Sequence, residues 1–148
     1  MIRLGRRALG AAFVLPALGA CGMFRDTIAL RSIAFRVAEG ANANSAIPVD
    51  LVLISDDTVV PPIIALTAAE WFQRREQFQR DFPSKLRVMN FELVPGSTVA
   101  ARPVSRSPRP VAAIVFANYQ VAGAHRLRVN TERDLVVVLG ERGGSLTQ

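Results

Sequence analysis

Cysteine, histidine and tryptophan are almost missing from this chain, which contains one residue of each. Without a second cysteine the chain cannot form an internal disulfide, so its stability has to come from packing. Cys21 and His125 alone cannot supply the four nitrogen or sulfur ligands of a structural zinc site, and we expect neither a metal nor another cofactor. The sequence also lacks a Gly-x-Ser-x-Gly elbow and a phosphate-binding glycine loop, two common signatures of enzymes.

Long apolar runs and strong charge are scarce as well. The apolar run at residues 8–19 is shorter than the roughly 20 residues that a membrane-spanning helix needs. The formal net charge is +6, but Arg3, Arg6 and Arg7 precede that run and account for half of it. No basic stretch has the interleaved aromatic residues that single-stranded nucleic-acid binders use, so we expect no nucleic-acid partner.

The start of the chain has the parts of a secretory signal peptide, a basic segment followed by an apolar segment and small residues. Residues 18–21, Leu-Gly-Ala-Cys, resemble the lipobox of bacterial lipoproteins. That resemblance implies cleavage after Ala20 and acylation of Cys21, and several acyl chains anchor a protein durably. Gly22, in place of an aspartate, favours the outer membrane by the same resemblance. The alternative is an ordinary signal peptide, with Cys21 an incidental free thiol.

The rest of the chain reads as one β domain. Apolar alternation and turn residues predict strands at residues 27–38, 47–55, 86–94, 98–104, 111–119, 125–130 and 134–139. In the first strand the apolar residues change from even to odd positions, which indicates a β-bulge near Arg31 and Ser32. We therefore expect a mainly β fold, a sandwich of seven to eight strands with one inserted helix. The expected divisions are a signal peptide (1–20), a lipidated tether (21–26), the sandwich (27–140) and a flexible tail (141–148).

The inserted helix is predicted over residues 67–82. Thr67 and Glu70 form a capping box, and Pro83 ends the helix. Three of its aromatic residues, Trp71, Phe78 and Phe82, fall near one face, and Phe72 lies beside it. Such a stripe is typical of a packing face more than of a ligand groove. This face can cover strand 111–119, whose apolar residues do not alternate and which therefore needs cover on both sides.

No polar pattern indicates catalysis. A Ser-His-Asp triad is compatible with the composition, but His125 lies in a strand-like segment. Asp56 and Asp57 are adjacent carboxylates in a proline-flanked loop, which is typical of a solvated pair. Three prolines make segment 102–110 a loop or an edge strand, whose arginines are either solvated or able to meet phosphates. We do not expect an enzyme.

The order of these elements resembles the TssJ family, the outer-membrane lipoproteins of type VI secretion systems. The likeness rests on the lipobox, the first strand with its small-residue turn, and segments 47–53, 71–72, 91–96 and 111–119, followed by His125-Arg126. His125 stands where the family tends to have a tryptophan. The resemblance implies a transthyretin-like sandwich without catalysis, lipid-anchored on the periplasmic face of the outer membrane.

The resemblance also implies a partner, the periplasmic carboxy-terminal domain of the large IcmF-like inner-membrane component, TssM. In the family the loop joining the first two strands contacts that partner, and here this loop is residues 39–46. We expect Asn42 and Asn44 to make hydrogen bonds to the partner, with Glu39 as a charged rim residue. From composition alone the loop is a passive connection that contributes little to folding. The alternative functions are a pilotin or assembly lipoprotein of another envelope machine and, third, a small lipid-anchored hydrolase.

Overall fold

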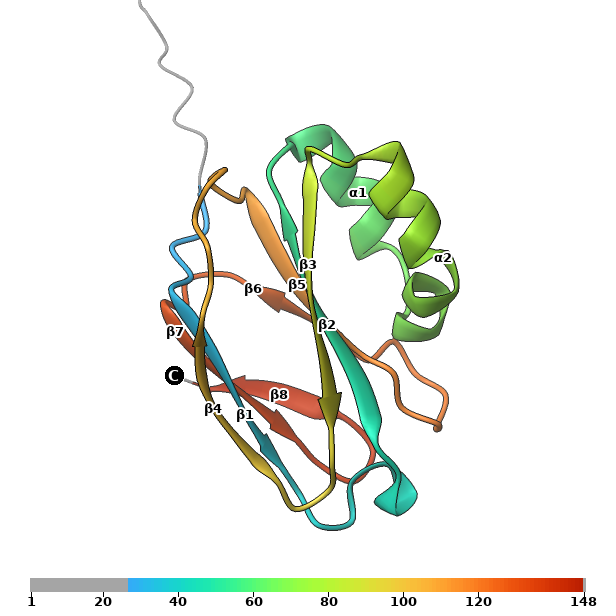
Figure 1. Cartoon of the computed structure of the whole chain (residues 1–148). Helices are drawn as coiled ribbons and strands as arrows, with labels where there is room; N and C mark the ends of the chain where they lie inside the picture. The colour runs from blue at the N-terminus through green and yellow to red at the C-terminus, as the bar shows by residue number, and fades with distance from the viewer. Residues whose placement is uncertain (1–26, 148) are drawn as a thin grey trace, which may run out of the picture.

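The computed structural model describes residues 27–147, so Cys21 and the predicted signal peptide and tether lie outside the described residues. Two four-stranded sheets face each other, and the helices cover the outer side of one of them (Figure 1). The first sheet has the order β4-β1-β7-β8, with β1 (Ser32–Val37), β4 (Thr98–Pro103), β7 (Asp134–Leu139) and β8 (Gly144–Thr147). The second has the order β3-β2-β5-β6, with β2 (Ile47–Ile54), β3 (Leu86–Leu93), β5 (Ala112–Ala117) and β6 (Arg126–Val129).

This architecture confirms the expected mainly β sandwich with an inserted helix. The β1–β7 pair is parallel, whereas the other strand pairs of the described chain are antiparallel. The pairing of β1 with β4 shifts register between Ile33 and Phe35, slightly later than the bulge expected near Arg31 and Ser32. As expected, both parity sets of this segment reach the same core, which includes Leu30 as well as Ile33 and Phe35.

The helical part is larger than predicted. It comprises η1 (Ala41–Asn44) and η2 (Asp57–Val59), both 3₁₀ turns, and α1 (Val60–Ile64) and α2 (Ala68–Asp81). Segment 56–62 had the composition of a loop because of its two prolines. Both prolines lie in the first turn of α1, where the missing backbone N–H costs no helical hydrogen bond. The capping box of α2 forms as predicted, with Glu70 N donating to Thr67 Oγ1 at 3.2 Å.

The end of the chain corrects a second expectation. Residues 141–148 were expected to form a flexible tail, but Gly144–Thr147 form β8 and pair with β7. Leu146 lies opposite Val137 and packs against the core, which gives this short strand an apolar contact. Segment 102–110 is confirmed as an edge and a loop, since β4 ends at Pro103 on the outside of its sheet.

Two cores stabilise the domain, one between the sheets and one between the second sheet and the helices. β2 contributes to both, because Val49 and Leu51 face the first core while Val52 and Ile54 face the second. All of β5 is buried, which confirms that α2 covers its second face. From residue 27 onward the chain thus has a hydrophobic core of its own, as an independently folding domain requires. No helix of the described residues is long and apolar enough to span a membrane.

Candidate partner interface

Four loops meet at one end of the sandwich, and we call this surface the loop end. They are residues 38–46 between β1 and β2, 94–97 between β3 and β4, 118–125 between β5 and β6, and 140–143 between β7 and β8. The strand directions require this arrangement, because β1, β3, β5 and β7 all run toward that end. In Figure 1, η1 lies at the bottom of the molecule, whereas the described chain begins at the opposite end.

Asn42 fastens three of these loops together. Its backbone N–H donates to Glu141 O at 3.0 Å, and its Oδ1 accepts a hydrogen bond from the backbone N–H of Gln120 at 2.7 Å. Its Nδ2 donates to Ala46 O at 3.1 Å, which closes the turn on itself. The fourth loop is held by Gly96, whose N–H donates to Ala38 O at 3.1 Å. The loop end is therefore a fixed surface, as a preorganised binding site requires.

Backbone strain is concentrated at the same end. Asn42, Ala43 and Asn44 follow one another in the left-handed region, with φ values of 50°, 52° and 60°. His125, at φ 44°, is the remaining non-glycine residue with positive φ in the described chain. Asparagine tolerates this region, but alanine does not favour it, and such residues cost of the order of 1–3 kcal/mol each. Residues held in this way cluster at functional sites, which makes the exposed tip formed by Ala43 and Asn44 the leading candidate for contact.

The structure leaves part of the expected contact surface exposed and corrects another part. Glu39 and Asn44 are exposed, as a contact role requires. Asn42 is only 4% exposed and both ends of its amide are hydrogen-bonded within the protein, so its side chain is a structural connector rather than a group offered to a partner. Ala41 is buried in the core as well. The expectation that this loop contributes little to folding is therefore wrong.

A groove and an exposed apolar side chain complete the loop end. The groove has a volume of about 340 Å³ and lies beside the tip, lined by Asn42, Ala43, Gln120, Val121, Glu141 and Arg142. Val94, next to the turn between β3 and β4, is 59% exposed, and no other large apolar side chain of the described residues is as exposed. Both features belong to the loop end, and protein interfaces commonly combine apolar contacts with a polar rim.

His125 stabilises the loop end instead of forming a triad. Its Nε2 lies 2.7 Å from Val121 O, and its ring stacks on Tyr119 with the ring centroids 4.9 Å apart. Tyr119 in turn donates its hydroxyl to Gly140 O at 3.0 Å. Burial raises the pKa of Tyr119 to about 12, so this donor stays protonated at ordinary pH. No hydrogen bond of the described residues joins His125 to a serine or a carboxylate.

The other candidates from the sequence also have structural roles. Asp56 caps η2 through Thr58 and pairs with Lys85 Nζ at 3.1 Å, and these hydrogen bonds lower its pKa to about 2. The loop after β4 is held by Arg87, whose guanidinium donates to the carbonyl oxygens of Ser105 and Ser107. Within the described residues no group of His, Cys, Asp and Glu is arranged to hold a metal ion.

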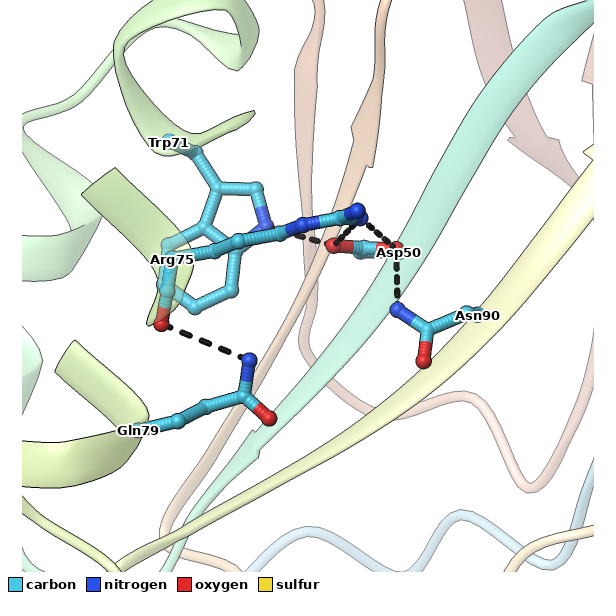
Figure 2. Close-up of polar contacts among 5 residues, drawn as sticks. All are labelled: Asp50, Trp71, Arg75, Gln79 and Asn90. Atoms are coloured by element: carbon cyan, nitrogen blue, oxygen red, sulfur yellow. Dashed lines mark hydrogen bonds and ion pairs between the residues drawn. The ribbon is translucent and has the colours of Figure 1, made fainter. Parts of the chain in front are cut away.

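Asp50 is an important residue that the sequence interpretation missed (Figure 2). Its carboxylate is 1% exposed and accepts hydrogen bonds from Trp71 Nε1 at 2.9 Å and Asn90 Nδ2 at 2.7 Å. Arg75 Nη1 forms an ion pair with the same carboxylate at 3.2 Å. Asp50 thereby fastens α2 to the second sheet. The signal was a single acidic residue within the apolar strand 47–55, at a position facing the predicted helix.

Comparison with known proteins identifies the fold. No family model matches the sequence, and no curated protein sequence matches it either. Three of the solved structures that match cover 80–82% of this chain. The T6SS lipoprotein TssJ1 from Pseudomonas aeruginosa matches over 95% of its chain with a TM-score of 0.57 and 20% identity. Lip from Serratia marcescens, described as a membrane bound component of the Type VI Secretion System, matches over 98% with a TM-score of 0.56 and 17% identity.

The third is a chain in a structure described as the T6SS protein TssM C-terminal domain from EAEC. It matches over 99% of its length with a TM-score of 0.58 and 11% identity. At these identities the matches establish architecture. The described residues therefore have the fold of the type VI secretion lipoprotein TssJ.

Proposed function

We propose that this protein is a lipoprotein of a type VI secretion membrane complex, anchored to the periplasmic face of the outer membrane through Cys21. In this proposal it tethers the complex by binding the periplasmic domain of a TssM-type inner-membrane component. The shared fold supports it, because TssJ1 and Lip are type VI secretion proteins of the same architecture. A chain of this fold also occurs in a structure whose description names TssM.

The observation that carries the proposal is the position of the loop end. The described chain begins at one end of the sandwich, and the fixed, strained loops lie at the other (Figure 1). An anchor ahead of residue 27 holds the first end near the membrane, so the loop end faces away from it. A protein that spans part of the envelope needs its partner site there.

The chemistry of the loop end indicates the kind of contact. Asn44 offers both a donor and an acceptor at the tip, and Glu39 offers a charge at the rim. Val94 supplies an exposed apolar contact nearby. A small set of central residues usually dominates the affinity of such a surface, with polar residues around it. We place the centre at the tip formed by Ala43 and Asn44.

Replacing both tip residues by glycine is expected to weaken binding without unfolding the protein. Glycine adopts positive φ without strain, so the Ala43→Gly, Asn44→Gly variant should melt at or above the wild-type temperature. Loss of the two side chains is expected to cost about 1–2 kcal/mol of binding, or about five- to thirtyfold in Kd. The measurement is calorimetric titration with the periplasmic domain of the TssM-type protein from the same organism.

Two further variants make this test specific. Asn42→Gly keeps the backbone conformation but removes the hydrogen bonds to Gln120 and Ala46, so it should lower stability by about 1–3 kcal/mol. Asn130→Gly changes an exposed residue at the opposite end, so it should alter neither the melting temperature nor the Kd for the partner domain. If the Ala43→Gly, Asn44→Gly variant binds the partner domain as tightly as the wild type, the tip does not belong to the interface.

Cys21→Ser is expected to release the protein from the outer-membrane fraction while the domain stays folded. Both cores of the described residues are built from residue 28 onward, so this change removes no contact from either core. Fractionation of cells, together with incorporation of labelled palmitate into the wild type, measures the effect. A serine variant that remains firmly in the outer membrane would exclude the lipobox hypothesis.

A further inference from the structure

The end of the sandwich opposite the loop end carries four exposed arginines, and we call this surface the basic end. Arg31 precedes β1, Arg106 and Arg109 lie in the loop after β4, and Arg133 precedes β7. Backbone hydrogen bonds hold these segments together, since Arg31 N donates to Arg133 O at 2.6 Å and Val104 N donates to Arg31 O at 2.7 Å. The arginines therefore come from three adjacent segments around the point where the described chain begins (Figure 1).

The basic end carries more basic than acidic residues, although carboxylates lie there too. None of the four guanidinium groups has an ion-pair partner within the described residues. The nearby carboxylates keep their negative charge but bond to other groups, and Asp56, which follows β2 at the same end, pairs with Lys85. Glu132 accepts hydrogen bonds from the backbone N–H groups of Asn130 and Thr131, and Asp134 accepts one from Ser32 Oγ. Exposed arginines without partners are available to an external anion.

We infer that the basic end binds the anionic phospholipid headgroups of the membrane to which the chain is anchored. The inference rests on the proposed lipidation of Cys21, because the tether decides which end meets the bilayer. Residues 22–26 separate Cys21 from the described domain, and an extended chain of that length reaches about 20 Å. The basic end is thus held close to the bilayer, where it can come within the screening length of about 8 Å at physiological salt.

Charge complementarity favours a lipid surface as the occupant. Each basic residue near an anionic membrane strengthens binding by about fivefold, so four arginines act together without a shaped pocket. The loop end has the opposite character, because Glu39 and Glu141 lie there with Arg142. The negative potential of an anionic bilayer therefore attracts the basic end and repels the loop end. Membrane contact would orient the domain so that the loop end points away from the membrane.

Vesicle binding of the unlipidated domain tests this inference. Residues 22–148 contain both cores and carry no acyl chain. We expect this protein to sediment with vesicles of equal parts phosphatidylethanolamine and phosphatidylglycerol but not with phosphatidylethanolamine alone. Binding should disappear at about 1 M salt, where the screening length falls to about 3 Å. Equal binding to both kinds of vesicle would overturn the inference.

A pair of charge-matched variants locates the effect. Arg106→Glu with Arg109→Glu is expected to weaken binding to the anionic vesicles at least tenfold, since about fivefold is lost per arginine. Arg36→Glu with Arg142→Glu changes the net charge equally, but Arg36 lies near the loop end on β1 and Arg142 lies within the loop end, so binding should fall less than about threefold. Equal loss in both variants would overturn the inference.

Melting curves must show that both variants are folded. Arg106→Gln with Arg109→Gln serves as the milder pair if charge reversal unfolds the first, and it is expected to weaken binding in the same direction. Because the protein used carries no lipid, a negative result here leaves the lipidation of Cys21 and the partner site at the loop end untouched. Fractionation of Cys21→Ser tests the anchor separately.

Discussion

Trp71→Ala is expected to lower the free energy of unfolding by about 3–5 kcal/mol, because it removes a large side chain from a filled interior. Trp71 is fully buried and stacks on Phe116, with ring centroids 5.2 Å apart and ring planes within 9°. It also contacts Phe78 at 6.0 Å between centroids. Urea denaturation followed by circular dichroism measures the loss from the shift in the transition midpoint.

Trp71→Phe is the control for this prediction. It keeps an aromatic ring in the interior but loses the indole N–H that donates to Asp50 at 2.9 Å, so we expect a smaller loss of about 1–3 kcal/mol. The total stability of a domain is about 5–15 kcal/mol, so this variant remains measurable even if the alanine variant unfolds. A loss below about 1 kcal/mol for Trp71→Ala would show that the aromatic face of α2 is not a packing face.

Asp50→Ala is expected to cost about 2–3 kcal/mol, the second largest effect. The change leaves the buried N–H of Trp71 without an acceptor, and a donor in that position loses its hydrogen bond without regaining water. The lost ion pair adds less, because the Arg75 side chain is 35% exposed and its charge can be hydrated. α2 would then be the first element to detach from the second sheet.

Hydrogen exchange of the α2 amides, measured alongside urea denaturation, checks this result. Glu76→Gln is a suitable control, since Glu76 is an exposed acid on the same helix and its change should stay within about 0.5 kcal/mol. If Asp50→Ala were as stable as the wild type, or if its added exchange were spread evenly over both sheets, Asp50 would not be the residue that fastens α2.

Features that depend on near neighbours could be predicted from the sequence. The capping box of α2 needs only Thr67 and Glu70, three residues apart, and it forms as expected. The alternation in strand 47–55 identified the face that meets the other sheet, and the unbroken apolar run of β5 indicated cover on both sides. Both signals lie within a single segment of sequence, so they are visible without knowledge of the pairing.

Features that depend on distant partners could not be predicted in this way. The side chain of Asn42 bonds to Gln120, 78 residues away, and composition alone made Asn42 look like a surface residue. Asp50 meets Trp71 and Asn90, which are 21 and 40 residues from it. β8 has little apolar character, and it forms because the edge of β7 offers unpaired backbone groups. Polar residues that are buried by tertiary contacts carry no local signature.

The parallel pairing of β1 with β7 has a mechanical consequence. Six residue pairs join these strands, from Ser32 with Asp134 to Val37 with Leu139, and β4 holds the other edge of β1. A pull on the chain ahead of β1, resisted at the loop end, acts along the strands. Where the pull is resisted at the loops after β7 and before β4, it loads both hydrogen-bond ladders in shear, and many bonds must break together before β1 can slide out. A domain connected in this way can transmit tension between a membrane and a partner without unzipping one bond at a time.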